Sequence, residues 1–154
     1  MQKDGTEKTK SARKPLIFLA VLLIVLGVLI FATFLQNKDK VLEIGGVKIA
    51  IKYARTPAEK QRGLCCRNSL PENSGMLFMY HSPGNYRFWM KDTHIPLDMY
   101  WISQDKKIVH IEENVQPSSY PRTFGTNQRA QYILETNAGF AKKHNIQIDD
   151  RVKF

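Results

Sequence analysis

The sequence has none of the short motifs by which the commonest enzyme classes are recognised. No Gly-x-Ser-x-Gly elbow, His-Glu-x-x-His pair or glycine-rich phosphate loop occurs in its 154 residues, which removes the usual sequence evidence for a serine hydrolase, a zinc protease or a P-loop nucleotidase. The four histidines show no metal-ligand spacing, and His94 with Asp98, or His110 with Glu112, supplies at most half a site. We therefore expect neither a metal ion nor a cofactor.

Cysteine is nearly absent as well, since the chain has only Cys65 and Cys66, which are neighbours. Two thiols are too few for a structural zinc site, and a bond between adjacent residues cannot staple distant parts of a fold. We expect two small, partly buried side chains without chemistry. The alternative in an oxidising compartment is a strained disulfide between the two, or a disulfide with another molecule.

Charge is absent from residues 15–35. These 21 residues are mostly Leu, Ile, Val, Phe and Ala, and about 20 apolar residues suffice to cross a bilayer. A cleaved secretory signal has a shorter apolar segment and a small-x-small cleavage site, whereas no clear Ala-x-Ala follows Gly27. The sequence therefore predicts one uncleaved transmembrane signal-anchor helix.

The cations that flank this segment predict its orientation. Five Lys or Arg residues precede it, and only Lys38 and Lys40 follow it closely, so the positive-inside rule keeps the N-terminus in the cytoplasm. We expect a single-pass protein of the cell membrane, with its C-terminal domain in the periplasm if the cell is Gram-negative. The predicted parts are a basic cytoplasmic tail, a membrane anchor, a linker and an extracytoplasmic β domain, at residues 1–14, 15–35, 36–40 and 41–154.

The net charge is moderate and positive. Of the total of +9, the tail holds +3 and the outer domain holds +6, from 18 cations and 12 anions. Such a domain could simply stay soluble beside a membrane, or it could be attracted to an anionic lipid or polymer. No basic run with base-stacking spacing occurs, so we expect no nucleic acid partner.

Short hydrophobic runs separated by turns fill residues 41–154 and indicate a mainly β domain. A hairpin is predicted around the Gly-Gly pair at residues 45–46, and Thr56 with Glu59 has the pattern of a helix N-terminus. A second short helix is expected after Asn137, which would cap it. The predicted fold class is a small β-sandwich or barrel with two short helices, preceded by one transmembrane helix.

Residues 86–101 are the most informative stretch, because they concentrate aromatic rings and polar side chains. We interpret them as the main part of two strands, at 86–90 and 97–102, joined by a polar corner at 91–94. Further along, residues 116–129 form a 14-residue loop. A loop of this length is unusual in a compact domain, and it could close over a groove or lie as a surface excursion.

Several motifs follow one another in a fixed order. They are Thr56-x-x-Glu59-x-x-Arg62-Gly63-Leu64, Arg67, Leu70-Pro71, Gly75-Met76-Leu77-Phe78, Phe88-Trp89-Met90-Lys91-x-Thr93-x-Ile95-Pro96-Leu97-Asp98, Tyr132-x-Leu134-Glu135 and Gly139. Over residues 42–154 this order resembles the domain of unknown function 192 family. The resemblance implies a compact, mainly β domain, usually secreted or membrane-anchored, and it implies no established activity. The family usually has Met where this chain has Cys65, and often an apolar residue where it has His94.

Six residues are candidates for a binding site. Seven aromatic residues lie between Phe78 and Trp101, and flat rings beside charged groups could hold a sugar or a short peptide of the cell envelope. The same rings could instead be the core of a small β domain. We expect a binding or envelope-support module for a small ligand, sugar or peptide, with the candidates on one concave surface. They are Arg62, Arg67, Trp89, Lys91, Asp98 and Glu135.

An enzyme is the alternative interpretation. Asp98 and Glu135 lie within apolar strand sequence, and two carboxylates that flank a scissile bond would suit a hydrolase acting on an envelope polymer. The same carboxylates could equally form an ion-pair cluster with Lys91 or Arg67 that fixes the fold.

Overall fold

The computed structural model describes residues 9–36 and 40–154, and within the first of these segments it describes the side chains of residues 16–31. The chain divides into two units, Met1–Lys38 and Asp39–Phe154. Residues 1–8 of the expected cytoplasmic tail and residues 37–39 of the expected linker lie outside the described residues.

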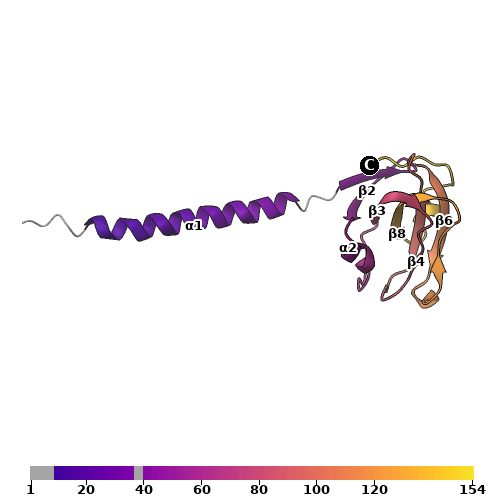
Figure 1. Cartoon of the computed structure of the whole chain (residues 1–154), viewed down its shortest axis with the longest axis horizontal. Helices are drawn as coiled ribbons and strands as arrows, with labels where there is room; N and C mark the ends of the chain where they lie inside the picture. The colour runs from indigo at the N-terminus through magenta and orange to yellow at the C-terminus, as the bar shows by residue number, and fades with distance from the viewer. Residues whose placement is uncertain (1–8, 37–39) are drawn as a thin grey trace, which may run out of the picture. The chain divides into compact units, whose positions relative to one another are not determined.

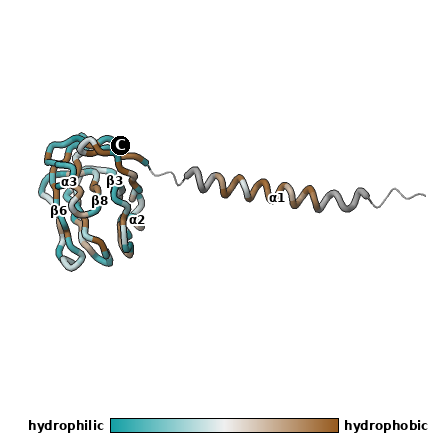
Figure 2. Tube along the Cα trace, turned by 180° about the vertical axis from the view of Figure 1, so that it is seen from behind, coloured by the Kyte–Doolittle hydropathy of each residue, from teal (hydrophilic) through white to brown (hydrophobic). Residues whose placement is uncertain are grey.

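The described residues of the first unit form a single helix, α1 (Thr9–Gln36). Its described side chains are exposed all around the helix, including Phe18 and Phe31, and Figure 2 shows their hydrophobic colouring. Within the described part of the chain, no helix reaches the length and apolarity needed to cross a membrane. The expected transmembrane span therefore stays a prediction.

The second unit is mainly β with two short helices, as the sequence predicts. Its strands are β1 (Lys40–Ile44), β2 (Val47–Ala54), β3 (Ser74–Gly84), β4 (Phe88–Trp89), β5 (Leu97–Ile102), β6 (Ile108–Val115), β7 (Thr123–Phe124) and β8 (Ala130–Asn137). Its helices are α2 (Pro57–Arg62), α3 (Phe140–Lys143) and the 3₁₀ turn η1 (Pro117–Ser119).

Six of the strands form one sheet in the order β1-β2-β3-β8-β5-β6 (Figure 1), and β4 and β7 pair as a separate two-stranded ribbon. The neighbours β2 and β3 are parallel, which requires a crossover, and α2 lies in that connection. The C-terminal segment joins the two edges of the sheet, because Lys153 pairs with Glu43 of β1 and Arg151 pairs with Lys107 beside β6.

Both faces of this sheet are covered. Successive residues of a strand point to opposite faces, so Phe78 of β3 belongs to one hydrophobic cluster and its neighbour Leu77 to the other. The β4–β7 ribbon and Leu64 cover the first face, which we call the ribbon face. Helix α3 covers the second, the α3 face, with Phe140. The central strands are therefore buried on both sides.

Two local predictions are confirmed. Gly45 and Gly46 have φ values of +57° and +76° in the β1–β2 turn, a region that glycine enters without the steric cost of a side chain. At the start of α2, the hydroxyl of Thr56 accepts a hydrogen bond from the Glu59 amide, and the Glu59 carboxylate accepts one from the Thr56 amide at 2.8 Å. This is the capping box that the sequence indicates.

Three other predictions need correction. β4 covers only residues 88–89 and pairs with β7 rather than with β5, because β5 already has β6 and β8 as partners. The expected loop at 116–129 contains η1 and β7, so it is a partner of β4 and not a structureless lid. Asn137 ends β8, and its amide donates to the Leu70 carbonyl, while α3 begins after Gly139.

Candidate functional site

A pocket of about 90 Å³ opens on the ribbon face. Its walls carry aromatic rings, its rim carries cations, and one carboxyl group, that of Glu135, lines it. The rings are those of Phe78, Tyr80, Phe88 and Trp89, and the cations are Lys60, Arg62, Arg87 and Lys91. The pocket therefore combines apolar surface, positive charge and one buried acid.

Glu135 is the most unusual group of this pocket. It lies in the middle of β8 with 5% of its surface exposed, and its buried Oε2 has no hydrogen-bond partner among the described residues. Burial raises the pKa of the Glu135 carboxyl to about 8, because the charged form loses the solvation of water. At neutral pH the carboxyl is therefore mainly protonated, so it can donate one hydrogen bond and accept others.

Three rings of the walls have aromatic partners close by. Phe78 and Phe88 meet edge to face, with ring centroids 4.8 Å apart, and Tyr80 stacks on Tyr86. Burial raises the pKa of the Tyr80 hydroxyl to about 12, so the phenol stays neutral. Trp89 is different, because 51% of its surface is exposed. It therefore offers a flat ring at the mouth of the pocket.

The cations of the rim have different partners. Lys60 lies 4.3 Å above the Tyr80 ring centre, and Arg87 donates hydrogen bonds to the Thr123 hydroxyl and carbonyl. Arg62 and Lys91 form no ion pair within the described residues. Four cations beside a neutral acid make the pocket electropositive at neutral pH, which favours an anionic ligand.

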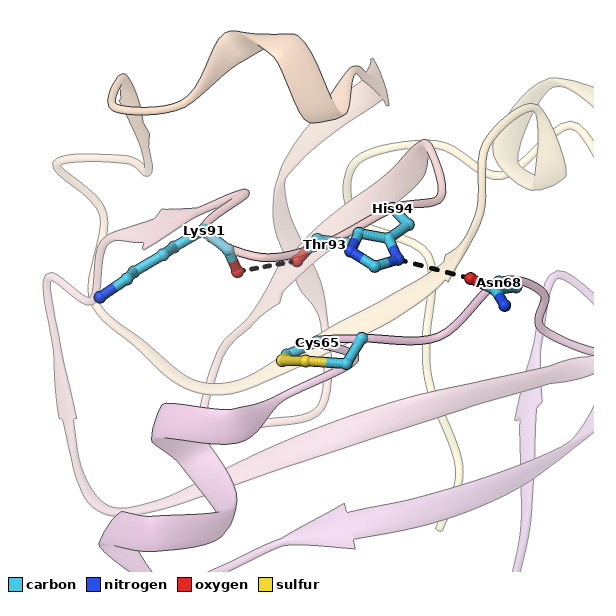
Figure 3. The surroundings of a disulfide bond; sticks show 6 residues. Cys65, Asn68, Lys91, Thr93 and His94 are labelled. Atoms are coloured by element: carbon cyan, nitrogen blue, oxygen red, sulfur yellow. Dashed lines mark hydrogen bonds between the residues drawn. A yellow bond between two sulfur atoms is a disulfide. The ribbon is translucent and has the colours of Figure 1, made fainter.

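The polar corner forms part of the pocket wall through Lys91 and Thr93. Figure 3 shows this corner beside a disulfide bond between Cys65 and Cys66. The prediction that the two cysteines are side chains without chemistry is therefore wrong. The structure has the alternative, a disulfide between the two neighbouring cysteines. Nδ1 of His94 lies 3.4 Å from the Asn68 side-chain oxygen, so a second contact joins the polar corner to the segment that follows Cys66.

A second cavity of about 170 Å³ lies on the other side of Leu64, which lines both cavities. It is mainly apolar, with Leu70 and Met76 in its walls and two cations, Lys52 and Arg67, at its edge. Arg67, one of the six candidates, therefore lies at this second cavity and not at the pocket of Glu135.

Asp98 does not belong to either cavity. Its side chain is fully buried on the α3 face, where the carboxylate accepts hydrogen bonds from the amides of Asn114, Gly139 and Ala141 at 2.8–3.1 Å. This carboxylate fixes the start of α3 and the end of β6. The expectation that all six candidates share one concave surface is therefore wrong for Asp98.

The pairing of β5 with β8 also separates the two carboxyl groups that a hydrolase would use. Asp98 lies opposite Thr136, and Met99 lies opposite Glu135. Residues that are opposite each other point to the same face, so Asp98 and Glu135 point to opposite faces of the sheet. The two carboxyl groups cannot flank one bond.

Four of the six candidates do meet at the pocket: Arg62, Trp89, Lys91 and Glu135. The sequence interpretation missed Lys60 and Arg87, which also line it. Arg87 directly precedes Phe88 and Trp89 in the sequence, and this position beside two aromatic residues could have indicated that it lines the pocket. Lys60 gave none, because its approach to Tyr80 depends on how α2 packs.

Comparison with known proteins identifies a family and several solved structures of similar fold. The family model DUF192, described as "Uncharacterized ACR", matches residues 40–154. A proposed transcription regulator from Sinorhizobium meliloti 1021 has a similar structure, with a TM-score of 0.69 and 30% sequence identity over 73% of this chain and 89% of that chain. A protein of unknown function from Novosphingobium aromaticivorans DSM 12444 has a TM-score of 0.71 and 28% identity, over 75% of this chain and 85% of that chain.

The comparison with curated proteins found no match. The family match covers the whole β unit described above, from β1 to the C-terminal segment. The resemblance inferred from the ordered motifs is confirmed, and the chain belongs to the domain of unknown function 192 family.

Proposed function

We propose that this chain is a membrane-anchored, extracytoplasmic binding protein whose pocket holds an acidic sugar unit of the cell envelope. The observation that carries the proposal is the buried carboxyl group of Glu135, which has no partner within the described residues and lines a pocket with a cationic rim. A buried polar group without a hydrogen bond costs about 1–3 kcal/mol. A ligand that supplies the missing bond recovers this energy.

The size of the pocket limits what can enter it. Its volume of about 90 Å³ is well below the roughly 300–1,000 Å³ of pockets that hold whole small molecules. Only one end of a ligand can therefore enter. The rest would lie against the exposed ring of Trp89, which has Tyr120 beside it at 6.0 Å.

The charges select the chemistry of this ligand. A protonated Glu135 suits a neutral hydroxyl group, because an acid can donate to one and accept from it. The cations at the rim, above all Arg62 and Lys91, suit a carboxylate or phosphate on the same ligand. Flat rings beside them suit the apolar face of a sugar. An acidic sugar combines all three features.

Anchoring in the membrane is supported by sequence and helical structure together. Residues 15–35 carry no charge, they lie within α1, and the cations before them outnumber those close after them. The side chains described between residues 16 and 31 are exposed and mainly apolar, so a lipid surrounding would remove them from water. The positive-inside rule then supports an extracytoplasmic position for the β domain.

Binding is proposed rather than hydrolysis because the pocket offers one acid. Glycoside hydrolysis ordinarily uses two carboxyl groups on either side of the bond, and Glu135 is the single carboxyl among the residues that line the pocket.

The test uses the full chain in a mild detergent, with D-glucuronate as the probe and D-glucose as its uncharged counterpart. We expect glucuronate to raise the Tm and glucose to leave it unchanged, because a ligand that binds only the folded state stabilises it. Lys91→Gln should weaken glucuronate binding about tenfold, or about 1.4 kcal/mol. Lys142→Gln, an exposed change on α3, is the matched control. Equal responses to both sugars, or equal affinities of the two variants, would refute the proposal.

A further inference from the structure

The Cys65–Cys66 bond does not stabilise the fold as a staple. A disulfide stabilises mainly by closing a loop in the unfolded chain, and its effect grows with the length of that loop. Here the two residues are adjacent, with a sequence separation of 1, so the bond restricts almost nothing in the unfolded chain. Its position in the domain needs another explanation.

We propose that Cys65 and Cys66 form a reversible thiol–disulfide site that exchanges with a dithiol donor. Cys66 is exposed and Cys65 is half-buried, so a small or protein dithiol can reach the bond. The chain has two cysteines, and both are used in this bond. The exchange partner must therefore be another molecule. The proposal is independent of the acidic sugar and stands if that ligand is wrong.

The exchange has two steps that balance. A thiolate of the donor attacks the Cys66 sulfur, the Cys65–Cys66 bond breaks, and Cys65 leaves as a thiolate that takes up a proton. The second thiol of the donor loses its proton and attacks the mixed disulfide, which releases Cys66 as a thiolate that is then protonated. Two electrons and two protons have moved from the donor to this pair, and the donor has become a disulfide. The reverse steps restore the oxidised state.

The surroundings favour this chemistry. In the sequence, Arg67 follows Cys66 directly and Arg62 lies three residues before Cys65. A cation that comes close to a cysteine sulfur stabilises the thiolate and makes it a better leaving group. Cys66 also has a φ of +64°, which a residue with a side chain seldom adopts. Opening the bond frees this residue to leave that conformation.

The two cysteines directly follow a residue that lines both cavities. Leu64, directly before Cys65, lines both cavities and is 3% exposed. The Cys66 amide also donates to the Asp92 carbonyl at 2.8 Å, which joins this segment to the polar corner that supplies Lys91 to the pocket. A backbone change at Cys66 therefore reaches the wall of the Glu135 pocket.

The experiment treats the native full chain with dithiothreitol, then with iodoacetamide, and counts the alkyl groups by mass spectrometry. We expect no alkyl group before reduction and two after it. When the reductant is removed and the protein is treated with oxidised glutathione before alkylation, we expect none, with no glutathione adduct left on the protein. Tryptophan fluorescence, which reports on the β domain because both tryptophans lie in it, should show that the domain stays folded throughout. Cys65→Ser, which leaves one free thiol, should take up one alkyl group without reduction.

Two results would overturn the proposal. The first is reduction that occurs only when fluorescence reports unfolding, since the bond would then be inaccessible in the native state. The second is protein that carries two alkylated cysteines without prior reduction, even after treatment with oxidised glutathione. Neither result depends on glucuronate binding, so the redox site and the sugar pocket are tested separately.

Discussion

Replacing Glu135 by Gln should remove a pH dependence from the stability of the β domain. The Glu135 carboxyl has a pKa of about 8 in the folded protein, compared with an ordinary value of 4.5. Between these values the unfolded chain has lost the proton and the folded chain has kept it. The free energy of unfolding therefore falls as pH rises through this window, and the stabilising effect of the protonated form is complete only below pH 4.5.

The size of the effect follows from the two pKa values. They differ by about 3.5 pH units, and each unit corresponds to about 1.4 kcal/mol, so the loss reaches about 5 kcal/mol at pH 8 and above. Domains of this size are stable by only about 5–15 kcal/mol. An effect of this size is easily measured. Gln has nearly the shape of Glu and no charge, so the variant should lack this slope.

The assay is urea unfolding of the full chain, followed by tryptophan fluorescence, at several pH values from 4 to 9. The quantity of interest is the difference in unfolding free energy between Glu135→Gln and the wild type at each pH, which removes the contribution of every other titrating group. We expect this difference to shift in favour of Gln by about 5 kcal/mol across the window. Glu113→Gln, at an exposed position near the end of β6, is the control. Parallel profiles for the wild type and Glu135→Gln would show that the buried carboxyl is not protonated.

Three further changes test the structural roles of single residues. Asp98→Asn should lower the free energy of unfolding by about 2–4 kcal/mol, because the Asn side-chain amide would replace the carboxylate that accepts hydrogen bonds from backbone amides. Glucuronate titration should show unchanged affinity for this variant. A loss of binding would show that Asp98 contributes to the ligand site. Gly75→Ala should cost about 1–3 kcal/mol or more in urea unfolding, since a Cβ there would lie 2.5 Å from the Glu135 carbonyl oxygen; an unaffected midpoint would contradict the close approach of β3 and β8. Thr56→Ala should cost about 1 kcal/mol through loss of the helix cap, and a stability equal to wild type would mean that the capping box contributes nothing.

Local features were predictable from the sequence because neighbouring residues determine them. The turn at residues 45–46 depends on two glycines, and the start of α2 depends on Thr56 and Glu59. The mainly β character follows from short hydrophobic runs whose length and composition need no knowledge of their partners. The uncharged segment at 15–35 is likewise a property of the chain alone.

Strand partners were not predictable in the same way. The sequence stretch at 86–101 looks like two joined strands, but β4 pairs with β7, which lies more than 30 residues further along the chain. Short strands of similar composition can pair in many ways, and the choice depends on which arrangement buries both faces of the sheet. The same reason explains why residues 116–129 looked like a free loop.

The sequence by itself determined the family, the mainly β domain and the presence of Glu135 and Asp98 among apolar residues. Only the tertiary structure decided that Asp98 supports α3 while Glu135 faces a cationic pocket. The reason is that the pairing of β5 with β8 places the two carboxyl groups on opposite faces of one sheet. Each acid then takes its properties from what covers that face: backbone amides bond one, and rings and cations surround the other.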